Sequence, residues 1–101
     1  MHTITAEFRI IEGKEAEAEA AIKKVVAGLE ANEPGALKYI WHRGVKDPNQ
    51  VFVFEIYRDD EAREQHRGTP YMTEFQAHFG TVFDPATVKV IRHERIAAVD
   101  R

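Results

Sequence analysis

The sequence predicts an α+β domain in the order β-α-β-β-α-β, with a four-stranded antiparallel sheet and helices on one face. Three observations predict it. The first ten residues alternate apolar and polar side chains, as a half-buried strand does. Residues 14–32 are rich in Ala, Glu, Lys and Leu, which favour a helix. Two segments dense in aromatic and β-branched residues then flank a turn-rich connector, which predicts a β-hairpin.

The first strand and the helix after it each have one apolar face. On the strand this face consists of Ile4, Ala6, Phe8 and Ile10. On the helix the apolar residues recur at helical spacing: Ala18, Ile22, Val25, Val26 and Leu29. The helix is expected to end near Asn32, because the Pro34-Gly35 pair that follows suits a tight turn and proline cannot continue a helix.

The hairpin is predicted to pair residues 37–43 with residues 50–58, joined by residues 44–49. A second helical region follows in two pieces. Asp59 and Asp60 can cap a short helix over residues 61–66, and Gly68 breaks it.

The second helical piece and the last strand complete the order. Thr69 is expected to cap the second piece, with Pro70 at its first position and Gly80 at its end. Asp84-Pro85 is predicted to be a turn, and residues 88–96 a last strand. This order is the ferredoxin-like arrangement, and residues 1–101 are interpreted as a single domain.

Composition excludes several kinds of chemistry. The 101 residues include neither cysteine nor serine, so disulfides, thiolate ligands and serine or cysteine nucleophiles are ruled out. The formal net charge of −3 argues against nucleic acid as a partner. No apolar run approaches the length of a membrane span, and the start of the chain does not resemble a signal peptide. We therefore expect a soluble, cytoplasmic protein with no membrane partner.

The third predicted strand is apolar on both faces. Phe52, Phe54 and Ile56 make one row, and residues 51, 53, 55 and 57 make the other. Near-continuous apolar strands are usually covered on both sides. Helices can cover only one face, so a second copy of the chain is the expected cover for the other. Two such sheets, stacked face to face in a homodimer, would enclose a barrel-like space.

Glu55 is the one charged residue in its row of this strand, and burying a carboxylate is costly unless it is paired. Tyr57 points to the same face, and His66 follows on the short helix. They could form a catalytic cluster with His66 as acid–base and Glu55 orienting either His66 or a substrate hydroxyl. Alternatively, Glu55 pairs with Arg43 or Arg9, and His66 is a satisfied capping group.

Other residues could line a pocket beside this cluster. They are aromatic or flexible apolar side chains that could equally belong to the core: Tyr39, Trp41, Tyr71, Met72 and Phe75. The histidines show no spacing typical of metal ligands, so no metal site is predicted.

The segment from Phe54 to Phe75 resembles the signature segment of the antibiotic biosynthesis monooxygenase family. There, a Glu-x-Trp/Tyr strand end precedes a short helix, a His, and a Thr/Ser-Pro start of the next helix. The matching residues are Phe54-Glu55-Ile56-Tyr57-Arg58-Asp59-Asp60-Glu61-Ala62, then His66, then Thr69-Pro70-Tyr71-Met72 and Phe75. Residues 4–9 and 34–39 also fit, so the resemblance covers essentially the whole chain.

The resemblance implies a dimeric α+β barrel that oxidises a quinol-like or polycyclic aromatic molecule with O₂ and without a cofactor. By position, His66 would be the base, Glu55 its hydrogen-bond partner or that of the substrate, and Tyr57 a donor in the pocket. The chain departs from haem-degrading relatives, which use an Asn on the first strand, so haem is not the expected substrate. Two alternatives stay open: an isomerase or tautomerase of a small metabolite, and a non-catalytic dimeric module for ligand binding or stress response.

Overall fold

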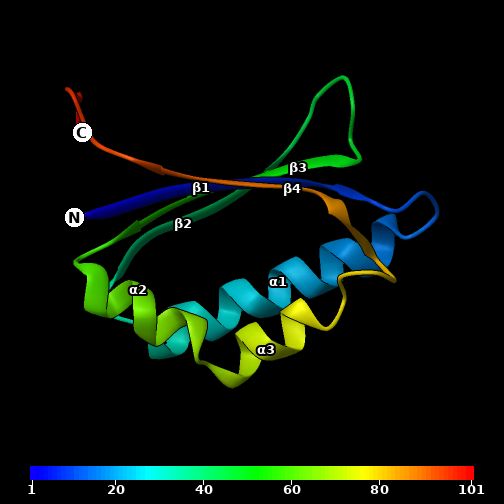
Figure 1. Ribbon diagram of the computed structural model, residues 1–101, viewed down its shortest axis with the longest axis horizontal. Helices are drawn as coiled ribbons and strands as arrows, with labels where there is room; N and C mark the ends of the chain where they lie inside the picture. Colours follow the sequence, from blue (N-terminus) through cyan, green and yellow to red (C-terminus); the bar gives the residue numbers. More distant parts are fainter.

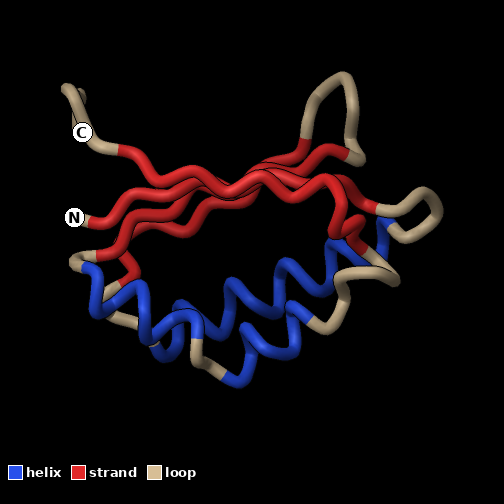
Figure 2. Tube along the Cα trace, viewed as in Figure 1, coloured by secondary structure: helices blue, strands red, loops and turns tan.

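The computed structural model describes residues 1–101 and contains a single sheet and three helices. Its elements are β1 (His2–Ile10), α1 (Glu15–Asn32), β2 (Ala36–Arg43), β3 (Gln50–Tyr57), α2 (Asp60–Arg67), α3 (Pro70–Gln76) and β4 (Phe83–His93). The strands are antiparallel and ordered β2-β3-β1-β4. Figure 1 shows the sheet as one layer and the helices as a second layer against one of its faces, and Figure 2 shows the same two layers. The predicted ferredoxin-like α+β fold is confirmed.

The helices begin where their capping residues predict. Asp59 accepts a hydrogen bond from the backbone N–H of Ala62 at 2.8 Å at the start of α2. Thr69 does the same for Met72 at 3.3 Å at the start of α3, with Pro70 in the first helical position. The two-piece helix is therefore confirmed, although α3 ends at Gln76 rather than at Gly80. No helix is long and apolar enough to cross a membrane.

α1 packs closely on α3 at one glycine. A Cβ atom added to Gly28 would lie 2.5 Å from Cγ of Tyr71, so only glycine permits this approach. The contact sets the Tyr71 ring beside the carboxyl-terminal end of α1, which is where the candidate site begins.

The prediction of a turn at Asp84-Pro85 is wrong, because β4 already begins at Phe83. Arg9 lies opposite Asp84, but Glu7 lies opposite Lys89, so the residues between them bulge out of the ladder. The side chain of Thr87 accepts a hydrogen bond from the backbone N–H of Arg9 at 2.9 Å and replaces a missing ladder contact. Asp84 and Pro85, which would otherwise favour a turn, are thus accommodated in a bulge of the β4 strand. The strand ends at His93, before the predicted Ile96.

The core between sheet and helices combines aliphatic side chains with a cluster of aromatic rings. Phe8 lies at its centre, with ring centroids 4.9 Å from Phe79, 5.1 Å from Phe83 and 5.6 Å from Trp41, all edge to face. These contacts join β1, β2 and the segment after α3 into one packed unit. They also fix Trp41 as a wall between two cavities described below.

The opposite face of the sheet is uncovered. Ile40, Phe52 and Ile91 are 45%, 36% and 40% exposed, respectively. Ile40 and Phe52 lie on the neighbouring strands β2 and β3, and Ile91 lies on β4, beyond β1. The two predicted rows of β3 are both present, since the other row faces the helices and is buried: Val51, Val53, Glu55 and Tyr57. The open apolar face agrees with the expectation that this chain alone does not cover it.

Candidate functional site

A cavity of about 180 Å³ lies between the sheet and helices α2 and α3. Its lining includes every predicted site residue except Tyr57 and Tyr71: Tyr39, Trp41, Glu55, His66, Met72 and Phe75. The cavity is on the helix-covered face of the sheet, within one chain. The sequence predicted an enclosed space between the two stacked sheets of a dimer. These residues line a space between the sheet and the helices of their own chain instead.

Glu55 and Tyr57 face the helices from β3 and contact each other. The Tyr57 hydroxyl donates to Oε1 of Glu55 at 2.6 Å, and both side chains are buried. Burial raises the pKa of Tyr57 well above its usual range, and the neighbouring Glu55 carboxylate adds to the rise. The hydroxyl therefore stays protonated and keeps Glu55 in place.

The alternative ion pairs for Glu55 are wrong. Arg9 pairs with Asp47 at 2.6 Å, and Arg43 pairs with Glu19 at 3.6 Å. Both arginines lie at the other end of their strands from Tyr57, so they cannot compensate Glu55.

His66 is held by Glu33, which the sequence reasoning did not single out. Nδ1 of His66 lies 3.1 Å from Oε2 of Glu33, and the two side chains are 1% and 8% exposed. A carboxylate can only accept, so Nδ1 carries the hydrogen in this contact and Nε2 of a neutral imidazole is left as an acceptor. The predicted pairing of His66 with Glu55 is therefore absent, and the His66 side chain is not a helix cap.

Tyr71 also contacts Glu33, from outside the cavity lining. Its hydroxyl donates to the same oxygen of Glu33, Oε2. Burial and the hydrogen bond to Glu33 raise the pKa of Tyr71 to about 12. Tyr71 is thus a donor to Glu33 rather than part of the cavity wall.

Glu33 was missed because its local sequence signals only the end of a helix. It follows α1 directly and precedes Pro34, so its pattern is that of an ordinary polar helix terminus. A second missed residue, Arg63, also lines the cavity. A signal for Arg63 was available, since it lies three residues before His66 on α2 and therefore on the same helix face.

Tyr39 also lines the cavity, and its ring centroid lies 5.4 Å from that of His66. Burial raises the pKa of Tyr39 well above its usual range, and Glu55 contributes to the rise. The cavity wall therefore combines a protonated tyrosine, a buried carboxylate, a histidine and an arginine on an aromatic background. No group of three or more His, Asp and Glu side chains is arranged to hold a metal ion.

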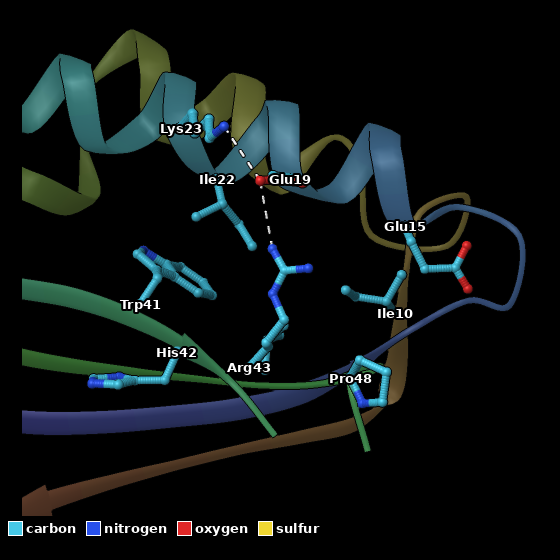
Figure 3. A pocket seen from close by; sticks show the side chains of 10 residues that line it. Ile10, Glu15, Glu19, Ile22, Lys23, Trp41, His42, Arg43 and Pro48 are labelled. Carbon is cyan, nitrogen blue, oxygen red and sulfur yellow. Dashed lines mark ion pairs between the residues drawn. The ribbon is translucent and has the colours of Figure 1, made fainter. Parts of the chain in front are cut away.

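A second cavity of about 170 Å³ lies between α1 and the end of β2 (Figure 3). Glu19 bridges its mouth, 3.6 Å from Arg43 and 3.3 Å from Lys23. The contact with Lys23, and to a smaller extent that with Arg43, lowers the pKa of the Glu19 carboxyl group. The charged groups at this mouth are exposed to solvent and already paired with each other, so they have little unused hydrogen-bonding capacity for a ligand.

Comparisons with known proteins agree with the fold. The family model for antibiotic biosynthesis monooxygenase matches residues 1–78. A Pseudomonas aeruginosa structure is 26% identical, with 95% of this chain and 94% of that chain covered at a TM-score of 0.84. A candidate antibiotic biosynthesis monooxygenase from Caulobacter crescentus is 25% identical, with 95% and 90% covered at 0.85. A Bacteroides thetaiotaomicron structure at 20% identity shares the fold, covering 99% and 93% at 0.89. None of the curated proteins matches this chain.

Proposed function

The chain belongs to the antibiotic biosynthesis monooxygenase family, and from that premise we propose that it oxidises a quinol-like aromatic molecule with O₂ and without a cofactor. The solved relative from Caulobacter crescentus, a candidate monooxygenase, supports the reaction class. The observation that carries the proposal is the buried contact between Glu33 and His66 on the wall of an aromatic cavity. A base that is held in one orientation and shielded from water suits proton abstraction from a phenol.

In this proposal His66 takes the proton of a quinol hydroxyl on Nε2. The carboxylate of Glu33 stabilises the imidazolium that forms and keeps the ring oriented, as the acidic member of a triad does. Glu55 accepts from a second substrate hydroxyl. Tyr57 acts as a positioning residue, because its own hydroxyl is already bonded to Glu55.

The oxygen step then needs no group beyond the substrate and O₂. The quinol anion passes one electron to O₂, and the resulting radical and superoxide combine at a ring carbon that bears hydrogen. Uptake of the proton held by His66 gives a hydroperoxide, and loss of water leaves a carbonyl at that carbon. One oxygen atom enters the product and the other leaves as water. The apolar walls contributed by Trp41 and Phe75 keep solvent from the anion.

Oxygen uptake tests the proposal. A panel of hydroquinones and anthrones is offered to the native protein and to His66→Ala, with His78→Ala as the matched control outside both cavities. We expect His66→Ala to lose roughly 10²- to 10⁴-fold in turnover and the control to lose none. No turnover of any compound, or equal turnover in His66→Ala, would overturn the assignment.

The same assay separates the alternatives. Conversion that continues unchanged without oxygen would indicate an isomerase or tautomerase that uses the same base. Tight binding without conversion, unaffected by Glu55→Gln and His66→Ala, would indicate a binding module.

We also propose that the protein is a homodimer joined through the open face of the sheet. The exposed side chains of Ile40, Phe52 and Ile91 support this, because they place apolar groups on this face of β2, β3 and β4. Phe52→Lys should yield a monomer in sedimentation velocity, whereas Val45→Lys, in the exposed connector, should leave the dimer intact. A native protein that sediments as one chain of 11.6 kDa at micromolar concentration would contradict the dimer.

A further inference from the structure

We propose that Arg63 binds the hydroxyl oxygen of a single-ring phenol in the cavity beneath α2 and α3 and stabilises the phenolate formed there. The inference deepens the proposed function and rests on it. Three features of the site support it: Arg63 has no ion-pair partner, the site already holds negative charge, and the cavity is small.

Arg63 is an arginine without a carboxylate partner inside a folded layer. Its guanidinium carbon lies 5.6 Å from the centroid of the Tyr57 ring, and its Nη1 is buried with no hydrogen-bond partner. The other arginines between residues 9 and 92 are ion-paired: Arg9 with Asp47, Arg43 with Glu19, Arg58 with Asp59, Arg67 with Glu64, and Arg92 with Asp60. A buried guanidinium nitrogen without a partner is costly, so the site keeps a strong donor unused.

The two carboxylates of the site bond to other residues. Glu55, on the same cavity wall, accepts from Tyr57, and Glu33 accepts from His66 and Tyr71. Trp41 adds a second unused donor on the cavity wall, since its Nε1 is also buried without a partner, whereas the unpartnered acceptor Oε1 of Glu33 lies outside the cavity lining. The two unused N–H donors on the wall can bind an oxygen of the ligand, and Nε2 of His66 stays available to accept its proton.

The negative charge already present in the site favours a phenol oxygen over a carboxylate oxygen as the ligand group. Two buried carboxylates already belong to the site, since Glu55 shares the cavity wall with Arg63 and Glu33 pairs with His66. A ligand carboxylate would bring a third negative charge, which like-charge repulsion disfavours. A phenol arrives neutral, and its negative charge develops only as its proton passes to His66, so the total charge of the site does not change. Arg63 is then placed to act where charge appears.

Size favours a ligand with one ring inside the cavity. A buried apolar cavity of roughly 150 Å³ binds benzene. The cavity here is about 180 Å³, and Val88 and Val90 in its lining are 42% and 54% exposed, so it has an open side. A benzene ring with small substituents fits inside, and a three-ring anthrone would extend out through the open side.

Equilibrium binding of 4-nitrophenol tests the inference without requiring turnover, because the ionised form of this phenol absorbs visible light. Native protein, Arg63→Met and Arg63→Lys are titrated at several pH values. Arg67→Met is the matched control, since Arg67 lies on the same helix but is exposed and paired with Glu64. We expect Arg63→Met to bind the phenolate on the order of tenfold to a hundredfold more weakly, Arg63→Lys to lie between, and Arg67→Met to match the native protein.

Bound phenol should also ionise at a pH about one unit or more higher in Arg63→Met, since tenfold in affinity for one form corresponds to one unit. Circular dichroism checks the fold of each variant, and the comparison of Arg63→Lys with the native protein carries the test if Arg63→Met does not fold. Equal phenolate affinity in the native protein and the Arg63 variant that folds would overturn the inference. So would tighter binding of benzoate or anthrone than of 4-nitrophenol. A protein that binds phenolate through Arg63 but consumes no oxygen would overturn the proposed function and leave this inference intact.

Discussion

Two cavities of nearly equal volume lie on the same side of the sheet and share Trp41 as a wall. The cavity between α1 and β2 has its charges at a half-exposed mouth, where Glu19 is already paired with Arg43 and Lys23 (Figure 3). The cavity beneath α2 and α3 is lined by a buried histidine, a buried carboxylate and an unpaired arginine, and a second carboxylate, Glu33, pairs with the histidine from outside the lining. Volume does not distinguish the two. What distinguishes them is whether the polar groups are satisfied by the protein itself.

The energetic difference follows from solvent. At the exposed mouth, water screens the ion pairs, and such pairs contribute little to stability. In the buried cavity the same kinds of groups interact strongly, so each unpaired one favours a ligand that can complete it. Substitutions in the two cavities should therefore differ in kind.

The largest effect is expected at the shared wall. Trp41→Ala would join the two cavities and remove the edge-to-face contact with Phe8. We expect the free energy of unfolding to fall by about 3 kcal/mol, since large-to-small core substitutions leave an unfilled space. Urea denaturation measures it, with Leu37→Ala on the same strand as an exposed control. A loss no greater than that of the control would show that Trp41 is not a structural wall.

The next effect concerns the carboxylates of the two cavities. Glu33→Gln should lower kcat on the order of tenfold, because the imidazolium of His66 loses its charged partner. Glu19→Gln, at the other cavity, should leave kcat unchanged. Steady-state kinetics check this, and an unchanged kcat in Glu33→Gln would show that Glu33 does not act on the base.

A pH titration probes the buried cavity without substitution. The three tyrosines of the chain, Tyr39, Tyr57 and Tyr71, have raised pKa values, and that of Tyr71 is about 12. An unfolded tyrosine ionises near pH 10. Because the folded state holds these protons more tightly, they favour folding fully below about pH 10, and this contribution is lost as the pH rises toward 12 and beyond.

The absorbance of tyrosinate near 295 nm should therefore stay low in the folded protein between about pH 10 and 11, while the protein in denaturant is half ionised near pH 10. Folded protein that ionises all three tyrosines near pH 10 would contradict the burial described here.

The smallest effect is expected at the exposed mouth. Arg43→Gln removes the bridge to Glu19, and we expect little change in Tm and none in turnover, since exposed pairs are weak. Thermal unfolding and oxygen uptake measure both. A large loss of turnover would mean that the second cavity takes part in the reaction.

Much of the fold could be predicted because its signals are local. The alternation in β1, the composition of α1 and the caps at Asp59 and Thr69 act within a few residues of the elements they define. The same local logic failed at Asp84-Pro85. Turn-forming residues there are absorbed by a bulge against Arg9, which only the pairing of β1 with β4 makes favourable.

The candidate site was predictable in part for the same reason. Glu55 was identified as a carboxylate in an apolar strand, and the structure places it in the cavity wall together with His66. Its actual partner, Tyr57, lies two residues along the strand and so on the same face. The interaction of His66 with Glu33 could not be predicted this way, because these residues are 33 positions apart and meet only when α1 and α2 pack on one face of the sheet.

The sequence by itself determined the order of helices and strands, the two rows of β3 and the chemical groups available for a reaction, because periodicity and composition are properties of short segments. Tertiary structure decided which groups meet. It placed the cavity on the helix-covered face, gave His66 its partner and left Arg63 without one. The physical reason is that burial and pairing depend on packing between distant segments, and pairing determines whether a polar group is satisfied or free to bind a ligand.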